Sequence, residues 1–112
     1  MIKVTVLYNI APTGDVQAFE AWRRRDHQKE NASAPGVVRT DFYIARDAGL
    51  GPPAFRYVTE SYYADQGALE AGFLSPARQE KIRSQVTQWQ LTDFTVLVSE
   101  EVASSAVETD GS

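Results

Sequence analysis

The residues best suited to chemistry lie in one short run, "AWRRRDHQKEN", at positions 21–31. The run contains Asp26 and His27, and His27 is the only histidine in the chain. A carboxylate beside an imidazole is suited to general acid–base catalysis, and the ordinary imidazole pKa of about 6.5 suits proton transfer near neutral pH. Their function depends on whether the local structure turns them toward the interior or toward solvent.

A helix is expected from about residue 15 to residue 32, so that it carries the whole run. Asp15 is a helix-capping residue type, and the stretch "SAPG" ends the segment. Val16, Phe19 and Trp22 recur at helical spacing. They predict the face that packs on the rest of the protein.

This helix would turn Asp26 inward. At ~100° per residue, the centre of the apolar face falls close to Asp26, with Arg23 within about 40° of it and His27 about 80° away. A buried carboxylate must be paired, hydrated or protonated. One interpretation is a structural bond from Asp26 to Arg23 or to a tyrosine. The other is a cavity between this helix and a sheet, in which Asp26 and His27 meet a ligand.

Alternating and β-branched sequences predict strands on both sides of this helix. "IKVTVLY" alternates strictly, and "VVRTDFYIA" and "FRYVTESYY" are rich in β-branched and aromatic residues. The connection 46–54 is rich in Gly and Pro and is expected to be a mobile lid. A second helical pattern breaks at Ser75 and Pro76, which fit an N-cap and a first helical position. The expected elements are strands at 2–8, 37–45, 55–63 and 91–102 and helical pieces over 65–89.

The order of these elements is β, α, β, β, α, β, which predicts an α+β, ferredoxin-like fold: a four-stranded antiparallel sheet with both helices on one face. The other sheet face would lack a cover and is not polar enough to meet water freely. A second copy packed on that face would give a homodimer, a dimeric α+β barrel. We expect one domain over residues 1–102 and a disordered tail over 103–112.

Strand side chains with polar groups are the candidates for holding a ligand beneath the helix. Tyr8 and Tyr57 need hydrogen-bond partners or a polar pocket. Thr59 alternates onto the same side of its strand as Tyr57. Asn9 ends the first strand, where it either orients a ligand or serves as a turn residue. The candidate substrate-binding residues, with two from the helix, are Tyr8, Asn9, Trp22, Arg23, Tyr57 and Thr59.

Composition excludes several classes of protein. The formal charge of −4 and the pI of about 4.9 give no attraction for nucleic acid or anionic lipid. No apolar run is long enough to span a bilayer, and the N-terminus alternates where a signal peptide would be continuously apolar, so a cytoplasmic location is expected. The absence of cysteine and the single histidine argue against thiol catalysis and a metal site. We expect no cofactor.

The stretch "FEAWRRRDHQKENASAPGVVRTDFYIA" and the later "FRYVTESYY" resemble the dimeric α+β-barrel superfamily, most closely its EthD-type and REDY-like members. In EthD-type proteins a helix histidine precedes a "PGV" loop and the second strand, as His27 precedes Pro35, Gly36 and Val37 here. "RRDH" resembles the REDY tetrapeptide, with Asp26 in register and His27 in place of tyrosine. The resemblance covers about residues 2–102.

The resemblance implies a range of activities, including polyketide cyclases, isomerases and cofactor-free monooxygenases. Haem-degrading relatives use a histidine on the second helix, which residues 66–89 lack. Cyclase relatives with a "HPAH"-like stretch differ from this chain, which has "SPAR" at 75–78.

Three functions remain open from sequence. The first is a cofactor-independent enzyme that acts by acid–base chemistry on a hydrophobic small molecule, aromatic or polyketide-like, with Asp26 or His27 as the base. The second is an accessory protein that binds or protects a pathway intermediate without chemistry. The third is a structural dimer with a filled core, which would leave no cavity.

Overall fold

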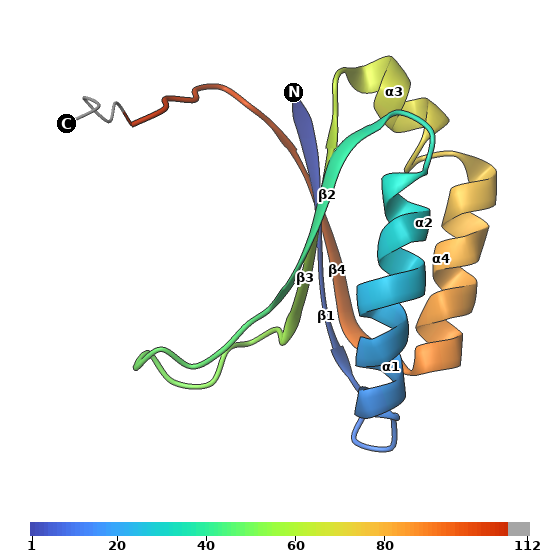
Figure 1. Ribbon diagram of the computed structural model, residues 1–112, viewed down its shortest axis with the longest axis vertical. Coiled ribbons are helices and arrows are strands. Elements are labelled where there is room, and N and C mark those ends of the chain that lie inside the picture. Colours follow the sequence, from blue (N-terminus) through green and yellow to red (C-terminus); the bar gives the residue numbers. More distant parts are fainter. Residues whose placement is uncertain (108–112) are drawn as a thin grey trace.

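A computed structural model describes residues 1–107 as an antiparallel sheet with helices packed on one of its faces (Figure 1). The strand order is β2-β3-β1-β4, which confirms the predicted α+β, ferredoxin-like fold. None of the helices within these residues has the length and apolar content needed to cross a membrane. The elements are β1 (Ile2–Ile10), α1 (Val16–Trp22), η1 (Arg23–His27), α2 (Gln28–Ala32), β2 (Val37–Ile44), β3 (Tyr57–Tyr63), α3 (Gln66–Ala71), α4 (Pro76–Trp89) and β4 (Leu91–Glu100).

Alternation along the central strands determines which side chains meet the helices. In β1, Val4 and Tyr8 are buried beneath the helical layer. Across the β1–β3 pair, Tyr8 lies opposite Tyr57 and Val6 lies opposite Thr59, so these β3 residues share the helix-facing side. The predicted grouping of Tyr57 with Thr59 on one face is therefore confirmed, and that face is the one under the helices.

The helices begin where the sequence provides caps. The side chain of Asp15 accepts a hydrogen bond from the Ala18 amide at 3.0 Å. Ser75 accepts one from the Arg78 amide at 3.2 Å, and Pro76 takes the first helical position of α4. The predicted break at Ser75 and Pro76 is thus confirmed. Proline is tolerated at this position because the first turn of a helix leaves its N–H groups unpaired in any case.

Gly36 fixes the turn that leads into β2 from the first helical segment, which consists of α1, η1 and α2 (residues 16–32). Its φ is +77°, and a Cβ there would lie 2.9 Å from the Ala68 carbonyl oxygen. We expect Gly36→Ala to lower the unfolding free energy by about 1 to 3 kcal/mol in urea titrations. Gly49→Ala is the matched control, since its φ is +97° but no atom lies within 4 Å of the added carbon. Equal losses in the two variants would show that the contact with Ala68 contributes nothing.

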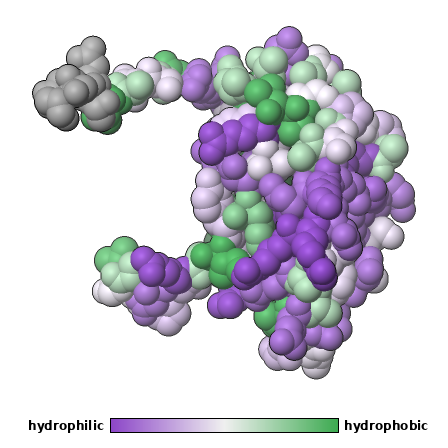
Figure 2. Space-filling view, in the orientation of Figure 1, coloured by the Kyte–Doolittle hydropathy of each residue, from purple (hydrophilic) through white to green (hydrophobic). Residues whose placement is uncertain are grey.

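Two segments project from the face of the sheet that the helices leave open (Figures 1 and 2). One is the connection between β2 and β3, residues 45–56, and the other is the chain after β4, residues 101–107, which forms no helix or strand. The connection extends away from the helices, and the role of residues 46–54 as a mobile lid stays a prediction. Of the predicted tail, 103–112, residues 108–112 lie outside the described part of the chain.

Candidate functional site

A cavity of about 70 Å³ lies between the helical layer and the sheet. This volume has room for several waters or a small organic group. Most of its wall is apolar, whereas a filled core would leave no such space. Its main polar side chains are Tyr8, Arg23, His27, Asn31, Thr59 and Arg78.

The first helical segment presents a row of residues spaced four apart to this cavity. Phe19, Arg23, His27 and Asn31 are all buried and all line it. A row spaced by four drifts around a regular α-helix, but residues Arg23–His27 form a π-helical turn. The wider π turn reduces the angular advance per residue and so keeps the row on one face. π-Helical turns are frequent at functional sites.

Asp26 is exposed on this segment, so the prediction that it points inward is wrong. The error arose because the apolar face was drawn through Val16 and Trp22 and extended at regular α-helical spacing, whereas the π turn shifts the residues that follow around the helix axis. Arg23 takes the interior position instead, and no hydrogen bond or ion pair joins it to Asp26 within residues 1–107.

The exposure of Asp26 leads to a simple prediction. We expect Asp26→Asn to change the unfolding free energy by no more than about 0.5 kcal/mol, because substitutions on the surface away from special contacts have small effects. Urea titration of the variant beside the wild type measures this. A loss of several kcal/mol in unfolding free energy would contradict this prediction and support the structural pairing of Asp26 with Arg23.

Arg23 is a buried cation with neutral partners. Its side chain is 1% exposed, and its guanidinium donates to Gln28 Oε1 at 2.8 Å and to Thr59 Oγ1 at 2.9 Å. The guanidinium also lies over the Phe42 ring, 4.2 Å from its centroid. Burial lowers the pKa of Arg23, and nearby Tyr8 opposes this shift. Within the described residues, no carboxylate lies within 4.0 Å of this guanidinium.

His27 is buried and stacked on Trp22, with ring centroids 4.3 Å apart and an interplanar angle of 18°. Its Nδ1 lies 3.7 Å from Glu30 Oε1. Burial, followed by repulsion from Arg23, lowers the pKa of His27 to about 3, although Glu30 opposes the shift. The imidazole is therefore neutral at neutral pH, and the expectation of an ordinary pKa near 6.5 is wrong.

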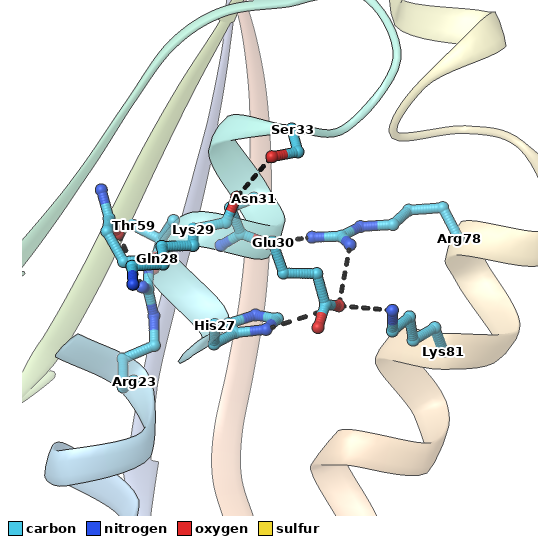
Figure 3. Close-up of polar contacts among 10 residues, drawn as sticks. All are labelled: Arg23, His27, Gln28, Lys29, Glu30, Asn31, Ser33, Thr59, Arg78 and Lys81. Atoms are coloured by element: carbon cyan, nitrogen blue, oxygen red, sulfur yellow. Dashed lines mark hydrogen bonds and ion pairs between the residues drawn. The ribbon is translucent and has the colours of Figure 1, made fainter. Parts of the chain in front are cut away.

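A polar network joins the first helical segment to α4 beside His27 (Figure 3). Arg78 donates to Asn31 Oδ1 and lies 3.7 Å from Glu30 Oε1, which also pairs with Lys81 Nζ at 2.5 Å. Sequence reasoning missed Asn31 and Arg78. The signal for Asn31 was its spacing of four from His27, and Arg78 was noted only as a departure from a histidine motif.

Tyr8 and Thr59 line the cavity, as Trp22 and Arg23 do. Burial raises the pKa of Tyr8, and the charge of Arg23 opposes the shift. The structure thus places four of the six predicted substrate-binding residues around one space.

Tyr57 and Asn9 do not belong to the cavity wall. Tyr57 is fully buried, stacks near Tyr8 at 5.6 Å between ring centroids, and donates its hydroxyl to Glu20 at 3.2 Å. Asn9 accepts from the Arg56 amide at 2.7 Å and donates to Ala54 and Asp93. Both side chains therefore have structural partners, which contradicts their predicted place in the site.

Comparison with known proteins shows similarity in structure. No protein-family model and no curated protein matches the sequence. An ethyl tert-butyl ether D (EthD) family protein from Bacillus halodurans is 20% identical, with a TM-score of 0.73 over 91% of this chain and 99% of that one. SnoaB, a cofactor-independent oxygenase from Streptomyces nogalater, is 16% identical, with a TM-score of 0.66 over 92% and 94%.

A third similar structure is a dimeric protein of unknown function and ferredoxin-like fold from Bacteroides fragilis. It is 10% identical, with a TM-score of 0.61 over 89% of this chain and 95% of that one. At these identities the likeness concerns the fold alone. It confirms the resemblance to the α+β-barrel proteins at that level.

Proposed function

We propose that this protein is a small cofactor-independent enzyme that acts by acid–base chemistry on a hydrophobic, aromatic or polyketide-like molecule in the cavity under the first helical segment. The observation that carries the proposal is a neutral imidazole, His27, facing the same apolar space as a buried guanidinium, Arg23. The fold likeness to a cofactor-independent oxygenase supports the same kind of chemistry.

The proposal gives a role to each group, supported by its position in the cavity. If Nδ1 of His27 carries the ring proton toward Glu30, at 3.7 Å, the other ring nitrogen is left as the base. Removal of a proton beside a carbonyl creates an enolate, and its oxygen would be stabilised by Arg23 and the hydroxyl of Tyr8. This step is common to cyclisation, isomerisation and cofactor-free oxygenation.

The test is enzymatic exchange of a carbon-bound proton. We would incubate the protein with phenylacetone, a benzyl ketone with a weakly acidic C–H bond, in deuterated buffer and follow exchange by NMR. His27→Gln should reduce the enzymatic rate by about 100-fold, the scale of a lost general base. Asp26→Gln, a change at the exposed neighbour, is the control and should leave the rate unchanged. An equal rate for wild type and His27→Gln would contradict the role of His27.

A non-catalytic accessory role is the second candidate, because two observations favour it. Asp26 is exposed, and the low pKa of His27, about 3, makes its imidazole a weak base. A ligand that raises the melting temperature without any exchange or turnover would support this role over the enzymatic one.

We propose further that the open face of the sheet is covered by a second copy, giving the homodimer expected from sequence. Leu97 on β4 is 51% exposed on this face, and Leu50 and Val102 on the projecting segments are 96% and 93% exposed. The open face is more polar than the alternation indicated, since it also carries the charged side chains of Lys3 and Glu60, which pair at 3.4 Å. The two projecting segments, 45–56 and 101–107, leave the body on the side where a partner would lie (Figure 2).

Light scattering tests the homodimer. Wild type should have twice the mass of the chain at micromolar concentration, and Leu97→Asp should shift the protein toward monomer because it places a charge in the buried interface. Val16→Asp is the matched control, since Val16 is 41% exposed on the helical side. A monomeric wild type, or a dimer that Leu97→Asp leaves intact, would contradict this interface.

A further inference from the structure

We infer that the cavity takes an anionic ligand: a small apolar molecule with one acidic group, a carboxylate or an ionised enol or phenol, whose oxygen lies against the Arg23 guanidinium. The inference rests on the proposed function and names the class of molecule for the same cavity. It applies equally if the protein only binds that molecule.

The first argument is the missing counter-charge of Arg23. A buried charge is costly unless it is paired, yet the partners of this guanidinium are the side-chain oxygens of Gln28 and Thr59 and the Phe42 ring. A guanidinium has five N–H groups in a fixed fork that matches a carboxylate, so those two hydrogen bonds leave donors for an incoming oxygen. Because Arg23 lines the cavity, a ligand in the cavity can supply the missing negative charge.

The second argument is the charge of the surroundings. Glu30 is shared by Arg78 at 3.7 Å and Lys81 at 2.5 Å. The charges that act on His27 are therefore three cations, Arg23, Arg78 and Lys81, and one carboxylate, Glu30, although the whole chain has a formal charge of −4. His27 is neutral and adds no charge to this group. Such a local excess of positive charge attracts an anion against the sign of the rest of the protein.

The third argument is the apolar remainder of the wall, which determines what the anion is attached to. Phe19, Trp22, Phe73 and Phe94 line the same space. Apolar walls with a few placed polar groups are typical of small-molecule sites. A free inorganic anion would leave this aromatic surface without contacts, whereas an aromatic or aliphatic acid would fill it.

The experiment compares an anion with its neutral counterpart of the same shape. We would titrate the wild-type protein with benzoate and with benzamide and follow binding by NMR chemical shifts. Benzoate should bind at least about tenfold more tightly, since a desolvated charge pair is strengthened in a buried site. 4-Nitrophenol, titrated below and above its own pKa, shows whether an ionised hydroxyl replaces the carboxylate as the preferred group.

Variants in the arginine run assign the preference to one residue. Arg23→Gln should abolish the preference for benzoate, and Arg23→Lys should retain part of it, because the charge remains without the planar fork. Arg24→Gln is the matched control. Arg24 is exposed, and among residues 1–107 its side chain pairs only with Glu20, at 3.5 Å, so its variant should bind as wild type does. If Arg23→Gln does not fold, the comparison of benzoate with benzamide on wild type still tests the anionic ligand, and Arg23→Lys still tests the assignment to Arg23.

The outcomes separate this inference from the proposed function. Equal binding of benzoate and benzamide to wild type would overturn the anionic ligand and leave the cavity as a small-molecule site. Binding of neither probe up to its solubility limit would overturn both. A preference for benzoate that survives in Arg23→Gln would overturn the assignment to Arg23.

Discussion

Lowering the pH from 6.5 to 4.5 should reduce the unfolding free energy by about 2 kcal/mol, and His27→Phe should remove most of this loss. The reason is that His27 has a pKa of about 3 in the folded protein and an ordinary value of 6.5 when unfolded. Below 6.5 the unfolded chain takes up a proton that the folded chain does not, so stability falls as pH falls. Phe keeps an aromatic ring against Trp22 and cannot titrate.

Between pH 6.5 and 4.5 the change in unfolding free energy can be assigned mainly to His27. It is the only histidine, and its surroundings are the cations Arg23, Arg78 and Lys81 and the carboxylate Glu30. The pKa of Glu30 is lowered below 4.5, so its contribution is lost only at more acid pH. Urea titrations of wild type and His27→Phe at several pH values give the comparison. Parallel pH profiles for the two proteins would show that His27 is not buried as a neutral group.

An anionic ligand should change this behaviour. Burial, and after it the charges of Arg23, Arg78 and Lys81, holds the pKa of His27 down, and a bound carboxylate would offset these charges. We therefore expect benzoate to raise the pKa of His27 and its binding to take up protons below neutral pH. Calorimetry in buffers with different ionisation enthalpies measures the proton uptake, which should be absent in His27→Phe.

Most of the fold could be predicted from sequence because local rules and tertiary packing agree. The strict alternation of residues 2–8 indicated a strand with Val4 and Tyr8 on the same face, and the structure buries both. The Ser75–Pro76 pair indicated a helix start, which the structure contains. Strand ends differ by one or two residues, since pairing with neighbouring strands determines where a ladder stops.

The site was harder to predict because its key geometry is an exception to regular helical spacing. A wheel of regular spacing places Asp26 inward with Arg23 beside it, whereas the π turn at Arg23–His27 brings His27 inward and leaves Asp26 exposed. Polar residues on a buried face also conflict with the expectation that such positions are apolar. The same conflict identifies the site, because a protein retains buried polar groups without full pairing mainly where they have a function.

Arg23→Met should raise the unfolding free energy by about 1 to 4 kcal/mol, while it abolishes the preference for an anionic ligand. Replacing a buried ion pair by apolar residues of similar volume is often neutral or stabilising by this amount. Arg23 is buried, and among residues 1–107 no carboxylate lies within 4.0 Å to offset the cost of burying its charge. Gln28 Nε2 retains its bond to the Thr40 carbonyl at 3.1 Å, whereas Gln28 Oε1 and Thr59 Oγ1 lose the guanidinium as donor, which offsets part of the gain.

The matched variant is Arg24→Met, which lies one position away on the exposed side and should change stability by no more than about 0.5 kcal/mol. Urea titration in the absence of any ligand compares the two variants with wild type. A stabilised Arg23→Met would mean that the wild-type residue is kept at the expense of stability, as residues of binding sites often are. A destabilised Arg23→Met would instead mean that the bonds to Gln28 and Thr59 hold the helical segment to the sheet, and that Arg23 serves the fold rather than a ligand.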